Sequence, residues 1–113
     1  MLGSDLLKAN AVDGTATLLQ KGHLTVTAAR IFADSAAADI ILQMFDAAAA
    51  ADVTVGTTIP DWVVVLDSAA APVSGGDGLP THGAEFKLGL VVACTTTPVG
   101  STGASANVRV WVK

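Results

Sequence analysis

The sequence has no tyrosine, a single cysteine and few charged side chains. Asp, Glu, Lys and Arg make up 14% of its 113 residues, against about 25% in an average soluble domain. Aromatic residues contribute 4%, whereas all apolar residues together reach 51%. Small and β-branched side chains in such numbers favour closely packed sheets. So few charges also indicate that other chains cover part of the surface.

Residues that could carry out chemistry are scarce. Cys94 has no partner for a disulfide within the chain, and its place in "LGLVVACTTT" predicts a buried, unreactive thiol. His23 and His82 have no paired His or Cys nearby, although a zinc site needs three or four ligands. The "GGDG" stretch at 75–78 lacks the Gly-Lys-Ser/Thr ending of a phosphate loop. We therefore expect no enzyme activity, no cofactor and no metal site.

The charge pattern and hydropathy predict neither nucleic acid nor a membrane as a partner. Six Lys and Arg face ten Asp and Glu, which gives a net charge of -4. The cationic residues are dispersed along the chain, without the basic stripe of a nucleic-acid-binding groove. No apolar run reaches the roughly 18 residues that cross a bilayer. No secretory signal opens the chain, so we expect synthesis in a cytoplasm.

Three segments show strand patterns most clearly. In "ANVRVWVK" (106–113), valines alternate with Asn, Arg and Trp, which is the two-residue period of a strand. "DWVVVLD" (61–67) and "GLVVACTTT" (89–97) are apolar runs of strand length. We expect the run that begins at Trp62 to be buried on both sides.

Three further segments are predicted as strands from weaker patterns. "HLTVTAARIFA" (23–33) begins in phase and then loses its alternation, which a β-bulge near Ala28 and Ala29 would restore. "DIILQMFD" (39–46) has the two isoleucines of a strand, and "TATLLQ" (15–20) is the weakest candidate.

Five alanines at 47–51 raise the question of a helix. Asp46 and Asp52 bracket them, and "VTVGTTIP" follows directly. An isolated helix shorter than about 12 residues is marginal even when it is rich in alanine. We therefore expect a strand that ends at Phe45 or Asp46, a connection with at most one helical turn, and a return strand from Trp62.

These segments together predict an all-β protein. Six to eight short strands, separated by Gly-, Asp- and Pro-rich turns, are typical of an antiparallel β-sandwich or barrel. An α/β fold would need amphipathic helices of ten or more residues, and none is evident. We expect Asp46, Asp61 and Asp67 to cap strand ends through bonds to nearby backbone N–H groups.

From His23 onward the chain resembles a family of small virion structural proteins of tailed bacteriophages. The matching elements, in order, are Phe45-Asp46, "GTTIP" at 56–60, Phe86 with Gly89-Leu90, the threonines at 95–97 and the closing strand at 108–112. Two features depart from the family: the glycine-rich loop at 74–82 is long, and the closing strand carries tryptophan where tyrosine is usual.

The resemblance implies a fold, a role and partners. The fold would be a jelly-roll-like β-sandwich over residues 23–113, with residues 1–22 as an N-terminal arm or edge segment. The role would be that of a decoration (cement) protein on the capsid surface of a virion. It would act as a homo-oligomer, typically a trimer, bound to the major capsid protein.

Six residues are candidate interface contacts. Trp111 lies opposite the valine row of its strand, so either a partner chain or a loop of the same chain covers it. Aromatic residues near arginine are enriched in interface hot spots. The candidates are Trp111, Arg109, Trp62, Leu2, Leu6 and Leu7. The alternative function, a carbohydrate- or receptor-binding module of a tail or fibre, would place exposed aromatics at one end.

Overall fold

The computed structural model describes residues 5–32, 39–66, 74–75, 79 and 82–113, and each structural statement below concerns these residues. They form nine β-strands and one short 3-10 turn, η1. The elements are β1 (Asp5–Val12), β2 (Thr17–Lys21), β3 (Leu24–Phe32), β4 (Ile40–Asp46), η1 (Ala50–Asp52), β5 (Trp62–Leu66), β6 (Ser74–Gly75), β7 (Ala84–Phe86), β8 (Gly89–Thr95) and β9 (Ala106–Val112). The predicted all-β class is confirmed, and the count exceeds eight only through the two-residue β6.

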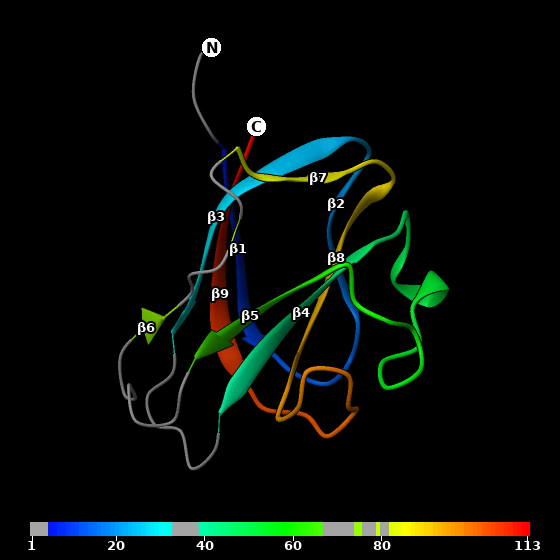
Figure 1. Ribbon diagram of the computed structural model, residues 1–113, viewed down its shortest axis with the longest axis vertical. Coiled ribbons are helices and arrows are strands. Elements are labelled where there is room, and N and C mark those ends of the chain that lie inside the picture. The colour runs from blue at the N-terminus through cyan, green and yellow to red at the C-terminus, as the bar shows by residue number, and fades with distance from the viewer. Residues whose placement is uncertain (1–4, 33–38, 67–73, 76–78, 80–81) are drawn as a thin grey trace.

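The strands form two antiparallel sheets with the strand order of a jelly roll. Sheet A has the order β1-β9-β3, with β6 and β7 both paired to β3, and sheet B has the order β2-β8-β4-β5. The chain crosses repeatedly from one sheet to the other, and the first and last strands pair side by side in sheet A (Figure 1). Two Greek keys folded into a double sheet have this order. The jelly-roll-like sandwich is therefore confirmed.

The core lies between the two sheets. Sheet A contributes the valine row of β9, Val108, Val110 and Val112, and all three are buried. Sheet B contributes Leu42 and Met44 of β4, which are fully buried against them in one cluster. The alternation read in "ANVRVWVK" is thus the inward and outward alternation of a sandwich strand.

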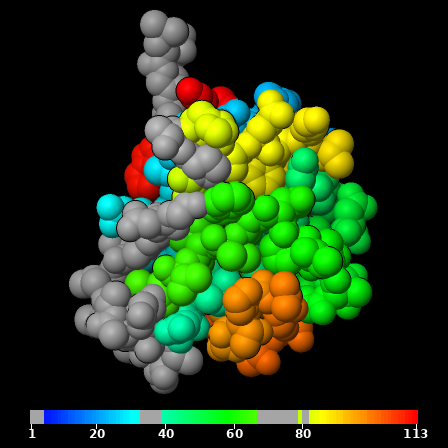
Figure 2. All heavy atoms as spheres, viewed as in Figure 1, coloured from blue at the N-terminus to red at the C-terminus, as the bar shows by residue number. Residues whose placement is uncertain are grey.

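The outward face of sheet B is also buried, because two loops cover it. Phe45, Val91 and Ala93 point away from the central core and form a second cluster with Ala47 and Val53 of the β4–β5 connection. Figure 2 shows this connection (green) beside the β8–β9 connection (orange) on one side of the molecule. The central strands β4 and β8 are accordingly buried on both faces.

Strand β5 was expected to be buried on both sides, and this expectation was wrong. Among the described strands, β5 pairs only with β4 and forms the edge of sheet B. Val64 and Leu66 point into the core, whereas Val65 is 45% exposed. An apolar run of this length is compatible with a central or an edge strand, and its composition alone cannot separate the two.

The bulge and the alanine stretch agree closely with the sequence. The register of β3 against β9 shifts between Val26 and Ala28, which places the bulge at Thr27, one residue before the predicted site. The alanines hold only the one-turn η1, and β4 and β5 have the predicted ends at Asp46 and Trp62. Because η1 is a single turn, no long helix interrupts the part of the sandwich that the structure describes.

Residues 1–22 were expected as an N-terminal arm or edge segment, and their described part, residues 5–22, supplies an edge strand to each sheet. β1 pairs with β9 at the edge of sheet A, and β2 pairs with β8 at the edge of sheet B. The terminal strand of a sheet leaves one row of backbone groups unpaired.

Candidate functional site

Several side chains on the outer face of sheet A are exposed. In one row across β1, β9 and β3, Leu6 lies opposite Trp111, which lies opposite Ala28. Leu6 is 40% exposed, Ala28 is exposed and Trp111 is half-buried. Phe32, also exposed, lies on the same face farther along β3, opposite Asn107. This face therefore presents apolar side chains to its surroundings.

The adjacent row of the same face is basic. Lys8 of β1 lies opposite Arg109 of β9, which lies opposite Arg30 of β3. Residues directly opposite each other in antiparallel strands have Cβ atoms about 5 Å apart. Half of the six cationic residues thus form one row, which corrects the expectation of dispersed positive charge. They are far apart in sequence and become neighbours only through the topology.

Hydrogen bonds hold the end of this face together at an irregular part of β1. Arg109 Nη1 donates to Asn10 Oδ1 at 3.0 Å, so its guanidinium is tied to β1. One residue further on, Ala11 has a positive φ of 53°, and its N–H donates to Asn107 Oδ1 at 3.0 Å. The register of β1 against β9 shifts here. These bonds position Arg109 beside the exposed Lys8.

The six candidate interface residues separate into three groups. Leu6, Arg109 and Trp111 share the outer face of sheet A. Leu7 and Trp62 pack against the central core instead. Leu2 lies outside the described residues, as does the expected capping residue Asp67.

Lys8, Arg30 and Ala28 belong to this face and were not singled out from the sequence. Arg30 interrupted the alternation of its segment, which is why a bulge was predicted there. Ala28 was read in phase with Leu24 and Val26, but it points outward with Trp111 because the bulge falls one residue earlier, at Thr27. Lys8 gave no such signal, because its strand was not predicted.

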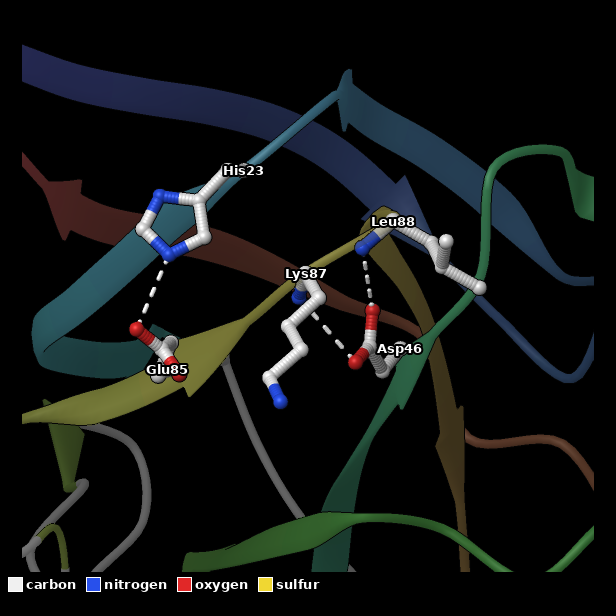
Figure 3. Close-up of polar contacts among 5 residues, drawn as sticks. All are labelled: His23, Asp46, Glu85, Lys87 and Leu88. Carbon is white, nitrogen blue, oxygen red and sulfur yellow. Dashed lines mark hydrogen bonds and ion pairs between the residues drawn. The ribbon is translucent and has the colours of Figure 1, made fainter.

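Three polar contacts lie at another part of the molecule, near the β7–β8 turn (Figure 3). Asp46 Oδ1 accepts the Leu88 N–H at 2.7 Å, and Oδ2 accepts the Lys87 N–H at 3.0 Å. His23 Nε2 lies 2.9 Å from Glu85 Oε2, and this pair is exposed. The bond to His23, followed by its charge, lowers the pKa of Glu85. An exposed pair of this kind contributes little to stability.

The acidic side chains at strand ends act as the sequence predicted. Burial alone would raise the pKa of Asp46, but backbone N–H groups of Leu88, Lys87 and Gly89 and the Lys87 charge outweigh it and lower the pKa. Asp61 Oδ2 accepts the Asp46 N–H at 2.7 Å. Both carboxylates thus bond backbone N–H groups near strand ends.

Groupings that would indicate other chemistry are not found in the described parts of the chain. Within these ranges, no three His, Cys, Asp or Glu side chains are grouped so that they could hold a metal ion. A helix with the length and hydropathy to cross a bilayer is likewise not found among them.

The Cys94 thiol is expected to be unreactive until the protein unfolds. Cys94 is buried in the core, as predicted. Burial, with a smaller effect of the Asp13 carboxylate, raises the pKa of the thiol to about 12. Because the thiolate is the reactive form, Ellman's reagent at pH 8 should leave the native protein unlabelled. It should label one thiol per chain in denaturing urea, whereas rapid labelling of the native protein would contradict the prediction.

Comparison with known proteins gave no relative from which a function could be transferred: no protein family, curated protein or solved structure matches the chain.

Proposed function

We propose that this protein is a structural protein of a tailed-phage virion, a decoration (cement) protein that stabilises the capsid by burying surface against neighbouring subunits. The observation that carries the proposal is the outer face of sheet A. Its central row joins Leu6, Trp111 and Ala28, and its basic row lies alongside. Apolar and aromatic side chains combined with arginine are typical of the centres of protein interfaces.

The rest of the architecture supports a binding role. The outward face of sheet B is covered by the protein's own loops, so the sheet face with exposed side chains that a partner could contact is that of sheet A. Strands that are paired and packed on the core present their side chains with little loss of conformational freedom on binding. The resemblance of residues 23–113 to small phage structural proteins is the reason for proposing a phage capsid as the shell.

A carbohydrate-binding module of a tail or fibre is supported less well. Such a module would gather exposed aromatic rings at one end. Of the five aromatic residues, all of which are described, Phe45 and Phe86 are buried and Trp62 packs on the core. Phe32 and Trp111 lie on the face of sheet A rather than in loops.

The test is binding to capsids of the encoding phage that were assembled without this protein. The purified chain should co-sediment with these capsids and raise the temperature at which they release DNA. Leu6→Ser should reduce the bound fraction at least about fivefold, because it removes an exposed apolar contact of the interface.

Leu18→Ser provides the matched control. Leu18 lies on the edge strand of sheet B and is similarly exposed, so its replacement should leave capsid binding unchanged. Equal binding of the two variants would reject sheet A as the contact face. No binding of the unmodified chain to any capsid preparation would reject the proposed function.

A further inference from the structure

Strand β5 carries none of the features that usually prevent a further strand from pairing with the border of a sheet. Its five residues, "WVVVL", have no charge and include no proline. All five pair with β4 in one unbroken register. Among the described strands β5 pairs only with β4, so the backbone N–H and C=O groups that point away from β4 have no strand partner there. This row of backbone groups is called the β5 edge below.

The other strands at the borders of the two sheets do carry such features. β1 contains Lys8, its register against β9 shifts, and Ala11 has a positive φ of 53°. β2 contains Lys21, and its register against β8 also shifts. β6 and β7, which pair with β3 at the other border of sheet A, have two and three residues. Charged residues, bulges and very short strands keep further strands away from a sheet. Among the described border strands, β5 is therefore the one suited to accept a partner.

The side chains of β5 indicate the chemistry of that partner. Val64 and Leu66 are in the core, so Val63 and Val65 point to the outward face of sheet B. Val65 is 45% exposed and Val63 is half-buried. An added strand places its side chains on the same two faces as its neighbour, within contact distance. Apolar side chains beside Val63 and Val65 would bury surface there, whereas a charged side chain would meet no counterpart. The matching partner is an extended, apolar segment.

The β5 edge lies next to the proposed capsid-binding face. β5 contacts β6 and β3, which belong to sheet A, and Figure 1 shows β5 and β6 at the same border of the molecule. Phe32 of β3 is exposed on the outer face of sheet A and pairs with Ser74 of β6. A partner that covers the outer face at Phe32 can thus continue past β6 to the β5 edge.

We propose that the β5 edge binds an extended apolar segment of the capsid subunit, which pairs with β5 as an additional strand of sheet B. Main-chain hydrogen bonds of an added strand supply affinity, and side chains beside Val63 and Val65 supply selectivity. The inference rests on the proposed function for the identity of the partner, and it adds a second contact of a different kind. The position beside the capsid-binding face is the reason for choosing the capsid subunit over a second copy of the chain.

Hydrogen–deuterium exchange of the full chain, alone and bound to capsids assembled without it, tests the pairing. The β5 amides that point away from β4 should exchange at least about tenfold more slowly in the bound state, because each becomes hydrogen-bonded. Amides of β2, at the opposite border of the same sheet, should be unchanged. Slower exchange of β5 in the isolated chain as its concentration is raised would assign the edge to a second copy and overturn the proposal.

A charge placed on β5 provides a second test. Val65→Lys should reduce the capsid-bound fraction at least about fivefold, because a lysine on a border strand opposes further pairing. Val65→Thr keeps a β-branched side chain of similar size and should bind within about twofold of the unmodified chain. Leu18→Lys is the matched control, because Leu18 is 37% exposed on β2 at the opposite border, and its replacement should leave binding unchanged. Circular dichroism should show cooperative unfolding for each variant.

The outcomes separate this contact from the proposed function. Equal binding of Val65→Lys and Leu18→Lys would overturn this inference and leave the proposed function standing. Unchanged exchange of β5 on capsids that do bind the chain would have the same consequence. A failure of the unmodified chain to bind any capsid preparation would overturn both.

Discussion

Replacement of Gln43 by leucine is expected to lower the free energy of unfolding by about 2–4 kcal/mol, because Gln43 ties the β8–β9 connection to sheet B. Its side chain is 0% exposed on the outward face of the central strand β4. Nε2 lies 2.7 Å from Thr95 Oγ1 and 3.0 Å from the Gly100 carbonyl oxygen, both of which accept from it. It also donates to the Thr97 carbonyl oxygen at 3.2 Å.

A leucine side chain fills a similar volume to that of Gln43 but cannot donate a hydrogen bond. Thr97 keeps a partner, since its carbonyl also accepts the Thr95 hydroxyl at 2.8 Å, so the loss falls mainly on Gly100 and Thr95. An unpaired buried polar group costs about 1–3 kcal/mol, which sets the range above. Urea denaturation should detect the change, and thermal unfolding should shift downward by roughly 10 °C.

Gln43→Glu is the informative companion variant. A carboxylate in this position would face three acceptor oxygens and would be held in its neutral form, with a raised pKa. A group whose pKa is raised in the folded state favours folding below its unfolded-state pKa and loses that contribution as pH rises. The Glu variant should therefore be less stable than the Leu variant at pH 7 and recover on acidification. If both variants unfold like the unmodified protein, Gln43 does not hold the connection.

The sequence predicted the direction of side chains better than the neighbours of strands. Alternation in "ANVRVWVK" placed the three valines inward and Arg109 with Trp111 outward, and the structure agrees. Alternation is local, because successive side chains in a strand point to opposite faces. Strand neighbours are set by pairing between distant segments. Lys8 and Arg30 became part of the candidate site only when β1 and β3 were placed beside β9.

The difference between local alternation and long-range strand pairing also explains why the burial of β5 was predicted wrongly. The runs at β5 and β8 are both rich in valine and of strand length, so composition predicts the same burial for both. β8 lies between β2 and β4, whereas β5 has one neighbour among the described strands. The role of Asp46 was predictable, because an aspartate that ends a strand commonly bonds nearby backbone N–H groups. The partner turn at Lys87 and Leu88 was not, since it is 41 residues away along the chain.

Replacement of Asp46 by alanine is expected to lower the free energy of unfolding by about 2–3 kcal/mol at pH 7, because two backbone N–H groups lose a charged acceptor. Asp46 ends β4 in sheet B and binds the turn through which the chain crosses from β7 in sheet A to β8 in sheet B. Loss of these bonds frees the crossing as well as the strand end. Asp52→Ala, a change of equal size at an exposed residue, should stay within about 0.5 kcal/mol of the unmodified protein.

The contribution of Asp46 to the free energy of unfolding should also depend on pH, and it should decrease as the pH falls. The backbone donors outweigh burial and hold the folded-state pKa of Asp46 below its ordinary value of 3.8. A lowered folded-state pKa means that the ionised carboxylate stabilises the fold above the unfolded-state pKa, and that this stabilisation is lost as pH falls through the folded-state value. Urea denaturation of the unmodified protein and of Asp46→Ala should therefore differ most at pH 6–7 and converge towards pH 2–3. A difference that stays constant over this range would show that the carboxylate charge has no part in holding the crossing.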